Sequence, residues 1–345
     1  MRWLGLRRRM LTTRNGPVTF YRAYYYCPQC KRGFAPADGP CQIPPGHATW
    51  AVRDRVALLG AWLPFGQVEQ VWTHLTDLPV SHGSAEHWTE ALGSAYVPPT
   101  PERYDPGPAV DTLFIEVDGV LVRFTDGWHE VKVAVCWGRK NGEDLPPRYL
   151  TSQASWDDFL PEVYELARQQ GARRARKVVT LADGAKPIRS LLTRLFPDAL
   201  HLLDWYHVQE YLAAVARELP DGAVWHEQQQ EALAERGPTE TLAALTTLTK
   251  KVKGSRKAVR EAAQTALTYM TGRTEQLDYP EARRLGYPIG SGRVESACKF
   301  VVQQRCKQPG MRWKHRHVDA VLSARRAYLN GDWELANKQL IAIAA

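Results

Sequence analysis

The chain has 345 residues, 44% of them hydrophobic and 24% charged, which is ordinary for a soluble globular protein of two or three domains. It contains no apolar run of about 18 residues, so we expect no membrane association, and the basic N-terminus lacks the apolar stretch of a secretory signal. Lys and Arg total 45 against 37 Asp and Glu, and the resulting charge of +8 favours a polyanionic partner. Six scattered cysteines do not suggest a disulfide framework, and they favour a reducing, cytoplasmic location.

Residues 1–46 form a cysteine-containing segment in which Cys27 and Cys30 are separated by two residues. This spacing is typical of one half of a zinc ribbon or finger. Tetrahedral Zn²⁺ needs four ligands, and the sequence has no second pair of this spacing. Cys41 and His47 are the nearby residues that could complete a site, so a partial zinc ribbon and a pair of free thiols both remain open.

Residues 47–95 show helical periodicity, with apolar side chains three or four residues apart over 51–63 and again over 68–77. A short turn follows, and Ser84 is the predicted N-cap of a third helix. Two helices, a turn and a helix are the layout of a DNA-binding helix-turn-helix, although a plain helical hairpin has the same pattern. The proline-rich segment 96–110 is predicted to be an extended linker.

Residues 111–220 have the periodicity of strands alternating with helices. The run from Asp111 to Phe124 is apolar on both faces, and we expect two strands that turn at Asp118-Gly119. The predicted elements then follow as a strand, a helix, a strand ending at Asp183-Gly184, a helix, a short strand and a helix. This order predicts an α/β, ribonuclease-H-like catalytic domain, with a mixed sheet and helices on both faces.

Residues 221–285 lack strand signals and are predicted to form an all-α insertion domain. The insertion includes the basic run 248–260, which could line one helical face, although a solvated charged face is the simpler interpretation. Residues 286–345 are predicted to be the C-terminal helices of the catalytic core. The first of these helices has Ser291 near its N-cap and Glu295 in its first turns.

Asp118 and Asp183 each precede a glycine at a predicted strand end. Neighbouring strands would bring the two carboxylates together, and the resulting repulsion favours a bound cation, with Mg²⁺ first and Mn²⁺ next. A third acid would complete a centre for two metal ions. Glu295 is the best placed, with Glu116 and Asp126 as competitors, although Asp126 fits better in a turn at residues 125–127. A single Asp-Gly pair would equally fit an ordinary hairpin turn.

Asp204 and His207 lie three residues apart where the last predicted strand gives way to a helix. At that spacing they share one helical face, and the histidine could contact a phosphate. An aspartate that only caps the helix explains the same pattern.

These motifs together resemble the DDE transposases of bacterial insertion sequences, most closely the ISKra4 family, which is related to IS256 and Mutator-like transposases. The resemblance rests on the two Asp-Gly pairs, the segment 204–207 (DWYH), the segment 290–296 (GSGRVES), and the tail segments 307–313 (KQPGMRW) and 326–331 (RAYLNG). Each motif is weak alone, but their order and spacing are specific, and they cover most of the chain.

The resemblance implies that Asp118, Asp183 and Glu295 are the catalytic, metal-binding acids and that Asp204 and His207 form the family's D-x-x-H motif. It also implies a Mg²⁺-dependent enzyme that cleaves the terminal inverted repeats of its element and joins them to target DNA. Such an enzyme would act as a homodimer or higher homo-oligomer on double-stranded DNA in the bacterial nucleoid. Family members tend to have a further cysteine pair upstream, so a truncated DNA-binding remnant is one alternative. A nuclease of the same fold that only hydrolyses DNA is the other.

Overall fold

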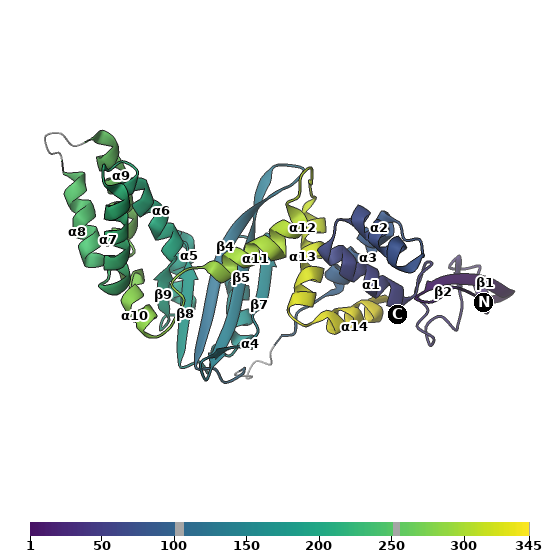
Figure 1. Ribbon diagram of the computed structural model, residues 1–345. Coiled ribbons are helices and arrows are strands. Elements are labelled where there is room, and N and C mark those ends of the chain that lie inside the picture. The colour runs from purple at the N-terminus through teal and green to yellow at the C-terminus, as the bar shows by residue number, and fades with distance from the viewer. Residues whose placement is uncertain (101–106, 251–255, 345) are drawn as a thin grey trace. The chain divides into compact units, whose positions relative to one another are not determined.

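The computed structural model describes residues 1–100, 107–250 and 256–344. The chain divides into two compact units. Figure 1 shows their helices and strands, coloured by residue number. Unit 1 comprises Met1–Pro99, Leu121–His129 and Phe300–Ala345, and unit 2 comprises Thr100–Val120 and Glu130–Lys299. Among the described residues, no helix is both long and apolar enough to cross a membrane.

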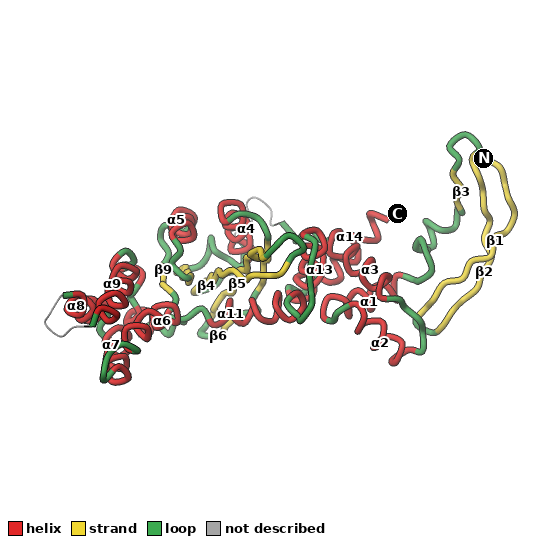
Figure 2. The backbone as a smooth tube through the Cα atoms, turned by 90° about the horizontal axis from the view of Figure 1, so that it is seen from above, coloured by secondary structure: helices red, strands yellow, loops and turns green. Residues whose placement is uncertain are grey.

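Unit 1 begins with a three-stranded antiparallel sheet, which is the pair of long strands and one short strand drawn in yellow in Figure 2. Its strands are β1 (Arg2–Thr13), β2 (Gly16–Cys27) and β3 (Arg32–Phe34). Cys27 ends β2 and Cys30 lies in the turn that follows, where hydrogen bonds with Cys30 lower the pKa of the Cys27 thiol. Within the described ranges, neither cysteine belongs to a group of three ligand atoms within 4.8 Å of one another, so zinc binding stays a prediction.

Three helices follow, as the pattern of residues 47–95 predicts: α1 (Trp50–Trp62), α2 (Phe65–Thr76) and α3 (His82–Ala95). They pack around a core that includes Val52, Val68 and Trp72. The predicted N-cap of the third helix was wrong by one turn. Ser81 is the cap, because its side-chain oxygen accepts a hydrogen bond of 3.2 Å from the backbone N–H of Ser84.

The C-terminal helices of unit 1 are α12 (Gln304–Cys306), α13 (His315–Leu329) and α14 (Trp333–Ala344). Two buried arginines connect this segment to the last turn of α1, where backbone carbonyls have no partner within the helix. Arg305 donates to the carbonyl of Gly60 at 2.9 Å, and Arg325 donates to that of Ala61 at 2.7 Å. Residues from Phe300 onward therefore group with the N-terminal helices, whereas the sequence assigned 286–345 to the catalytic core.

Unit 2 is built on a mixed sheet with strand order β6-β5-β4-β8-β9, in which β7 also pairs with β5. Its strands are β4 (Thr112–Arg123), β5 (Trp128–Lys140), β6 (Glu143–Asp144), β7 (Arg148–Ser152), β8 (Lys177–Ala182) and β9 (Leu200–Leu203), of which β4 and β5 extend into unit 1. The three strands β4, β8 and β9 are parallel, whereas β5 pairs antiparallel with β6 and β7. The predicted α/β class with a mixed sheet is confirmed.

The predicted hairpin turn at Asp118-Gly119 was wrong, because β4 runs unbroken through both residues. A Cβ atom at Gly119 would overlap the carboxylate of Glu130 on β5, which is the end of a flexible side chain that can move aside, so close packing does not require a glycine here. The strand reverses at residues 125–127, where Gly127 has a φ of +147° and its carbonyl accepts from Phe124 N–H at 2.7 Å. Asp126 lies in this turn, as expected.

Alternate residues of β4 face opposite sides of the sheet. Leu113, Ile115 and Val117 pack with α4 (Trp156–Gln169) and α5 (Lys186–Leu195). Phe114 and Glu116 face the other side, where α11 (Gly292–Ala297) lies, and a π-helical segment (Cys298–Gln303) continues α11. Helices therefore cover both faces, and Figure 2 shows α4 and α11 on opposite sides of β4 and β5.

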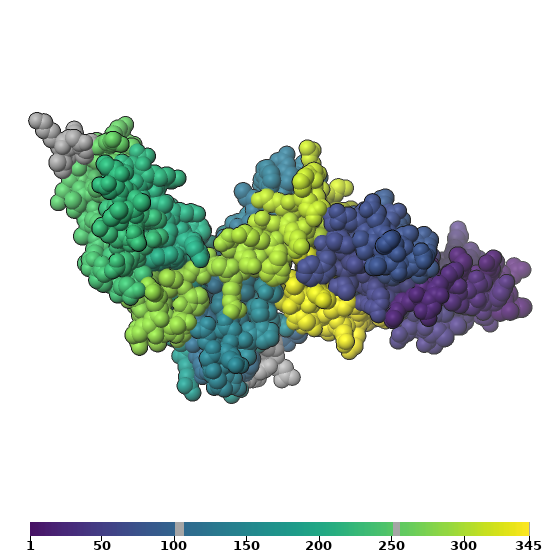
Figure 3. Space-filling view, in the orientation of Figure 1, coloured from purple at the N-terminus to yellow at the C-terminus, as the bar shows by residue number. Residues whose placement is uncertain are grey.

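After β9 the described chain of unit 2 is helical as far as residue 285, which agrees with the predicted insertion. Its helices are α6 (Trp205–Ala216), α7 (Gly222–Glu235), α8 (Pro238–Thr249), α9 (Lys257–Thr271), the short 3₁₀ turn η1 (Thr274–Gln276) and α10 (Tyr279–Arg284). They pack around a buried core and form the green body in Figure 3. Residues 251–255 of the basic run and 101–106 of the proline-rich linker lie outside the described residues.

Candidate active site at the sheet edge

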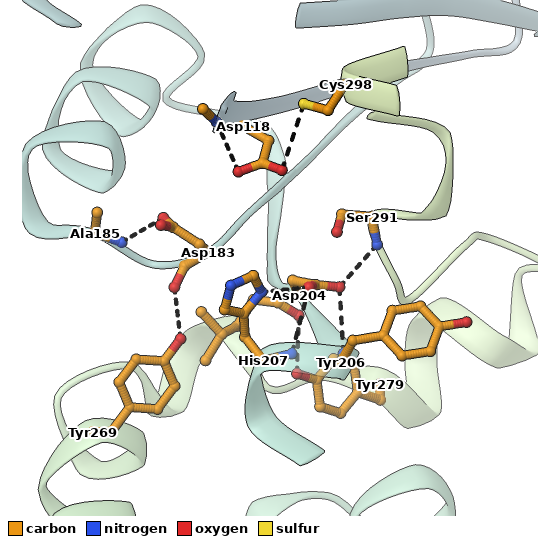
Figure 4. Close-up of polar contacts among 12 residues, drawn as sticks. Asp118, Asp183, Ala185, Asp204, Tyr206, His207, Tyr269, Tyr279, Ser291 and Cys298 are labelled. Carbon is orange, nitrogen blue, oxygen red and sulfur yellow. Dashed lines mark hydrogen bonds and ion pairs between the residues drawn. The ribbon is translucent and has the colours of Figure 1, made fainter. Parts of the chain in front are cut away.

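Three aspartates lie in register where β8 and β9 end: Asp183 and Asp204 directly follow these two strands, and Asp118 lies within β4 beside them. β4 and β8 pair with Glu116 opposite Leu181, and the same register places Asp118 opposite Asp183. β8 and β9 pair with Ala182 opposite Leu203, so Asp183 and Asp204 correspond one residue later. Side chains at equivalent positions of neighbouring parallel strands face the same side, and Figure 4 shows these carboxylates around one space. Ligands of open α/β sheets bind at this kind of edge.

Asp118 is held in place by contacts on both of its carboxylate oxygens. Oδ1 accepts from the N–H of Gly119 at 2.7 Å, and Oδ2 lies 3.7 Å from the thiol of Cys298. Burial raises the pKa of Asp118, and the negative charge of Asp183 adds to that increase. Asp183 in turn accepts from the N–H of Ala185 at 2.8 Å, which fixes its carboxylate at the start of α5. Asp118 and Asp183 therefore lie close enough for their charges to interact, while a metal ion shared between them stays a prediction.

Asp204 is both a helix cap and the partner of a histidine. Its carboxylate accepts from the backbone N–H groups of Tyr206 and His207 at the start of α6, and from Ser291 N–H at 2.8 Å. Its Oδ2 is also 2.6 Å from His207 Nδ1. Asp204 therefore caps α6, as one of the two interpretations predicts, and it also pairs with His207, while contact of His207 with a phosphate stays a prediction.

The Asp204–His207 pair is charged at neutral pH. The hydrogen bond with Asp204 raises the pKa of His207 to about 9 in spite of burial. Burial would raise the pKa of Asp204, but its hydrogen bonds with His207 and Ser291 outweigh burial and lower it. The positive charge of the imidazolium opposes the increase in the pKa of Asp118, and the negative charge of Asp183 adds to the increase in the pKa of His207.

Glu116 is a fourth acid on the same face as Asp118, two residues earlier on β4. Its side chain is completely buried, and Oε2 accepts from the N–H of Val294 on α11 at 2.7 Å. Burial raises the pKa of Glu116 to about 7. Its other oxygen, Oε1, is buried without a hydrogen-bond partner among the described residues. A buried, unsatisfied carboxylate oxygen needs a partner that the protein itself does not provide.

Glu295, the predicted third acid, lies one turn of helix before Cys298, whose thiol contacts Asp118. Three residues apart on a helix, Glu295 and Cys298 share one face. Burial and then the charge of Asp118 raise the pKa of Cys298, and the charge of Glu295 adds to that increase. Its carboxylate is half-exposed and pairs with Lys299 at 2.6 Å. The π-helical segment begins immediately after α11, and such irregularities are frequent at functional sites.

Helices of the insertion hold the ends of the two acid-bearing strands β8 and β9. The hydroxyl of Tyr269 donates to the carbonyl of Asp183 at 2.6 Å, and Arg273 donates to that of Gly184 at 2.8 Å. The hydroxyl of buried Tyr279 donates to the carbonyl of Leu203, directly before Asp204. These contacts could not be predicted from the sequence, because a helical pattern does not show which distant backbone atom a tyrosine reaches.

The donor set at this edge fits a hard divalent cation. Asp118, Asp183 and Glu116 supply carboxylate oxygens, one of them unpartnered among the described residues, and the positive charges of His207 and Arg293 offset part of their negative charge. The set Asp118, Asp183 and Glu295 is not, however, among the described groups whose ligand atoms all lie within 4.8 Å of one another. Two other groups of acids and histidines meet that distance: Asp126, His129 and His315, and Glu86, Glu90 and His317.

Residues 89–338 match the uncharacterised protein family UPF0236, and the chain belongs to that family. The match supports the broader part of the resemblance, to transposase-like proteins of insertion sequences, and gives no specific support for ISKra4. No curated protein matches the chain.

Two solved structures show remote similarity. One is titled "Crystal structure of NurA with manganese", at 14% identity and a TM-score of 0.15 over 74% of this chain and 60% of that one. The other is titled "Crystal structure of NurA", at 12% identity and a TM-score of 0.13 over 79% of this chain and 63% of that one. The chain thus spans less than two thirds of the length of either, and similarity at this level carries no argument about fold or activity.

Proposed function

We propose that this protein is an insertion-sequence transposase of the ISKra4 type, which cleaves the terminal inverted repeats of its element and joins them to target DNA. The observation that carries the proposal is the register that brings Asp118 and Asp183 to one sheet edge, with the helix of Glu295 over the same face. The strand order β7-β5-β4-β8-β9, antiparallel on one side and parallel on the other, supports a ribonuclease-H-like domain.

In this proposal Asp118, Asp183 and Glu295 hold Mg²⁺ or Mn²⁺, two ions per site. When bound, the ions would polarise the scissile phosphate and ease deprotonation of the attacking water or 3′-hydroxyl. Asp204 keeps His207 protonated and oriented, so that the ring can donate its remaining N–H to a phosphate oxygen. The attack forms one phosphorus–oxygen bond and breaks the bond to the leaving oxygen, which takes up a proton.

The N-terminal part would bind the inverted repeats. The β1–β2 hairpin is a two-stranded ribbon of a kind that fits the major groove, and it exposes Arg7 and Arg8. Helix α3, the predicted recognition helix, has no Lys or Arg, so the hairpin is the better candidate for the first contact with DNA. The net charge of +8 agrees with a partner rich in phosphates.

The test is a strand-transfer assay with the full chain, Mg²⁺ and duplexes that carry the element's pre-cleaved ends. Asp118→Asn should lower the yield of joined product by about 1,000-fold, while its affinity for the same duplex stays within about threefold. Fluorescence anisotropy would measure that affinity, which should fall steeply between about 50 and 200 mM salt.

Each alternative has its own outcome in this assay. Nicked DNA without any joined product would indicate a nuclease that only hydrolyses. Tight binding with no Mg²⁺-dependent cleavage by the wild-type chain would indicate an inactive DNA-binding remnant. Either result would overturn the proposed activity.

A further inference from the structure

The tip of the β4–β5 hairpin carries a second group of potential metal ligands, separate from the aspartates at the sheet edge. Asp126 lies in the turn, His129 begins the return along β5, and His315 is the first residue of α13. Their ligand atoms all lie within 4.8 Å of one another. The nearest pairs are Asp126 Oδ1 with His129 Nε2 at 3.1 Å and Asp126 Oδ2 with His315 Nε2 at 3.2 Å.

Both imidazole rings are fixed by a completely buried phenylalanine. The His315 ring stacks on Phe124 with centroids 4.3 Å apart and an interplanar angle of 16°. The His129 ring meets the same phenyl ring edge-on at 5.3 Å and 88°. Packing on one rigid ring limits the rotation of both imidazoles and keeps their Nε2 atoms beside one carboxylate. The donor atoms are therefore preorganised before any ligand binds.

The backbone also holds the two segments together. Thr125 N–H donates to the carbonyl of Trp313 at 2.9 Å, and Trp313 N–H donates to the carbonyl of Arg123 at 3.2 Å. Residues far apart in the sequence thus meet through main-chain bonds that do not involve the three side chains. Assembly of the group does not depend on attraction between Asp126 and the histidines.

One atom of the group is left unsatisfied. His129 Nε2 is buried, and it makes no hydrogen bond within the described residues, although Asp126 Oδ1 is only 3.1 Å away. The two atoms are close, but their directions do not meet the requirements of a hydrogen bond. His129 Nε2 and Asp126 Oδ1 are therefore close together without forming a hydrogen bond to each other. Two ligand atoms that bind the same metal ion have this arrangement.

We propose that Asp126, His129 and His315 bind a transition-metal ion of the Zn²⁺ class. Two imidazole nitrogens and one carboxylate are a donor set that Zn²⁺ prefers, whereas Mg²⁺ favours oxygen ligands alone. Three protein ligands leave one tetrahedral position for water. The three side chains are 43–54% exposed, so an ion can reach them from solvent. The bound ion links the tip of the hairpin to the first turn of α13.

The neighbouring group of Glu86, Glu90 and His317 provides an internal control. Its single imidazole contacts Glu90 at 2.5 Å and Glu86 at 3.8 Å, which is the arrangement of an ion pair between α3 and α13. His317 lies two residues from His315, on the same helix. Replacing His317 therefore tests whether any histidine at this end of α13 would account for metal binding.

The experiment is a titration of the metal-free full chain with Co²⁺, a spectroscopic substitute for Zn²⁺, in excess Mg²⁺ that occupies carboxylate sites. The background carries Cys27→Ser and Cys30→Ser, so that the thiols cannot contribute. We expect one Co²⁺ per chain with a d–d absorption band, and displacement of the ion by one equivalent of Zn²⁺. His315→Gln and Asp126→Asn should each weaken binding at least about 10-fold, because losing a ligand costs no less than losing a residue that supports one.

His317→Gln should bind Co²⁺ as the background chain does. Circular dichroism of every variant distinguishes a lost ligand from a lost fold, and the exposed ligand positions favour folded variants. No Co²⁺ band in the folded background chain would overturn the proposal. So would binding that survives His315→Gln and Asp126→Asn, or binding that disappears only with His317→Gln. None of these results depends on transposase activity.

Discussion

The β4–β5 hairpin contributes to two groups of potential metal ligands that differ in burial, in donor atoms and in charge. Asp118 is largely buried, and strand register aligns it with Asp183 and Asp204. Asp126, eight residues later, is exposed in a turn between two imidazoles. The first group consists of carboxylates and has a net negative charge, whereas two of the three ligands in the second group are imidazole nitrogens.

The difference shows what each kind of construction is suited for. Backbone hydrogen bonds between neighbouring strands fix the positions of the carboxylates relative to one another. Burial strengthens the electrostatic interactions among these carboxylates. Such an edge suits hard ions and charge development during a reaction. Rings packed on Phe124 fix imidazoles in a wet environment, where a tightly held softer ion can connect two segments. We therefore expect chemistry to depend on the first group and metal retention on the second.

The largest effect expected from this comparison concerns the third acid of the sheet edge. Glu295→Gln should lower strand transfer by about 1,000-fold, as for Asp118→Asn, if its carboxylate leaves Lys299 to complete the site. Glu116→Gln should cost less than about 10-fold, because Glu116 already accepts a hydrogen bond from Val294 and is protonated to a large extent near pH 7. Initial rates at saturating DNA would measure both.

The matched control is Glu261→Gln on α9. Glu261 is exposed and pairs with Lys257 four residues away, as Glu295 pairs with Lys299, but it belongs to the insertion. Loss of a surface ion pair alone should leave activity within about twofold, because such pairs contribute little. If Glu116→Gln abolished transfer and Glu295→Gln did not, Glu116 would be the third acid.

The sequence predicts much of this edge, and its failures have physical causes. Alternating apolar residues and the Asp-Gly pair at Asp183 indicate the strands. Once β4 and β8 are neighbours in the sheet, Asp118 lies beside Asp183. The error at Gly119 arose because an Asp-Gly pair is common in turns but also occurs within strands, and β4 continues through Asp118 and Gly119. The burial of Glu116 could not be predicted, because it depends on a helix about 180 residues further along the chain.

A smaller effect is expected on the pH dependence of stability through Glu116. The pKa of this glutamate is 4.5 in an unfolded chain and about 7 in the folded chain, so the folded state binds the proton more tightly. The folded state must therefore lose stability as the pH rises from about 4.5 to about 7, by on the order of 3 kcal/mol for a shift of this size. Glu116→Gln removes this loss, since glutamine does not titrate.

Urea unfolding at pH 5 and pH 8 in EDTA would measure this difference, with no divalent ion present to perturb the acids. All other titrating groups are common to both chains, so they cancel when the two pH responses are subtracted. Parallel responses of the wild-type chain and Glu116→Gln would show that Glu116 titrates normally.

The smallest effect we expect comes from Tyr269, which tests whether the insertion positions the acids. Tyr269→Phe removes the hydrogen bond to the carbonyl of Asp183. We expect this loss to raise the activation free energy of strand transfer by about 1 kcal/mol, which slows the reaction about fivefold. Tyr211→Phe is the control, because its ring stacks on Tyr269 at 4.1 Å and lies in the same core. A positioning role requires a slower rate at unchanged DNA affinity in Tyr269→Phe alone. Equal rates in both variants would mean that the insertion packs against the strand ends without aiming Asp183.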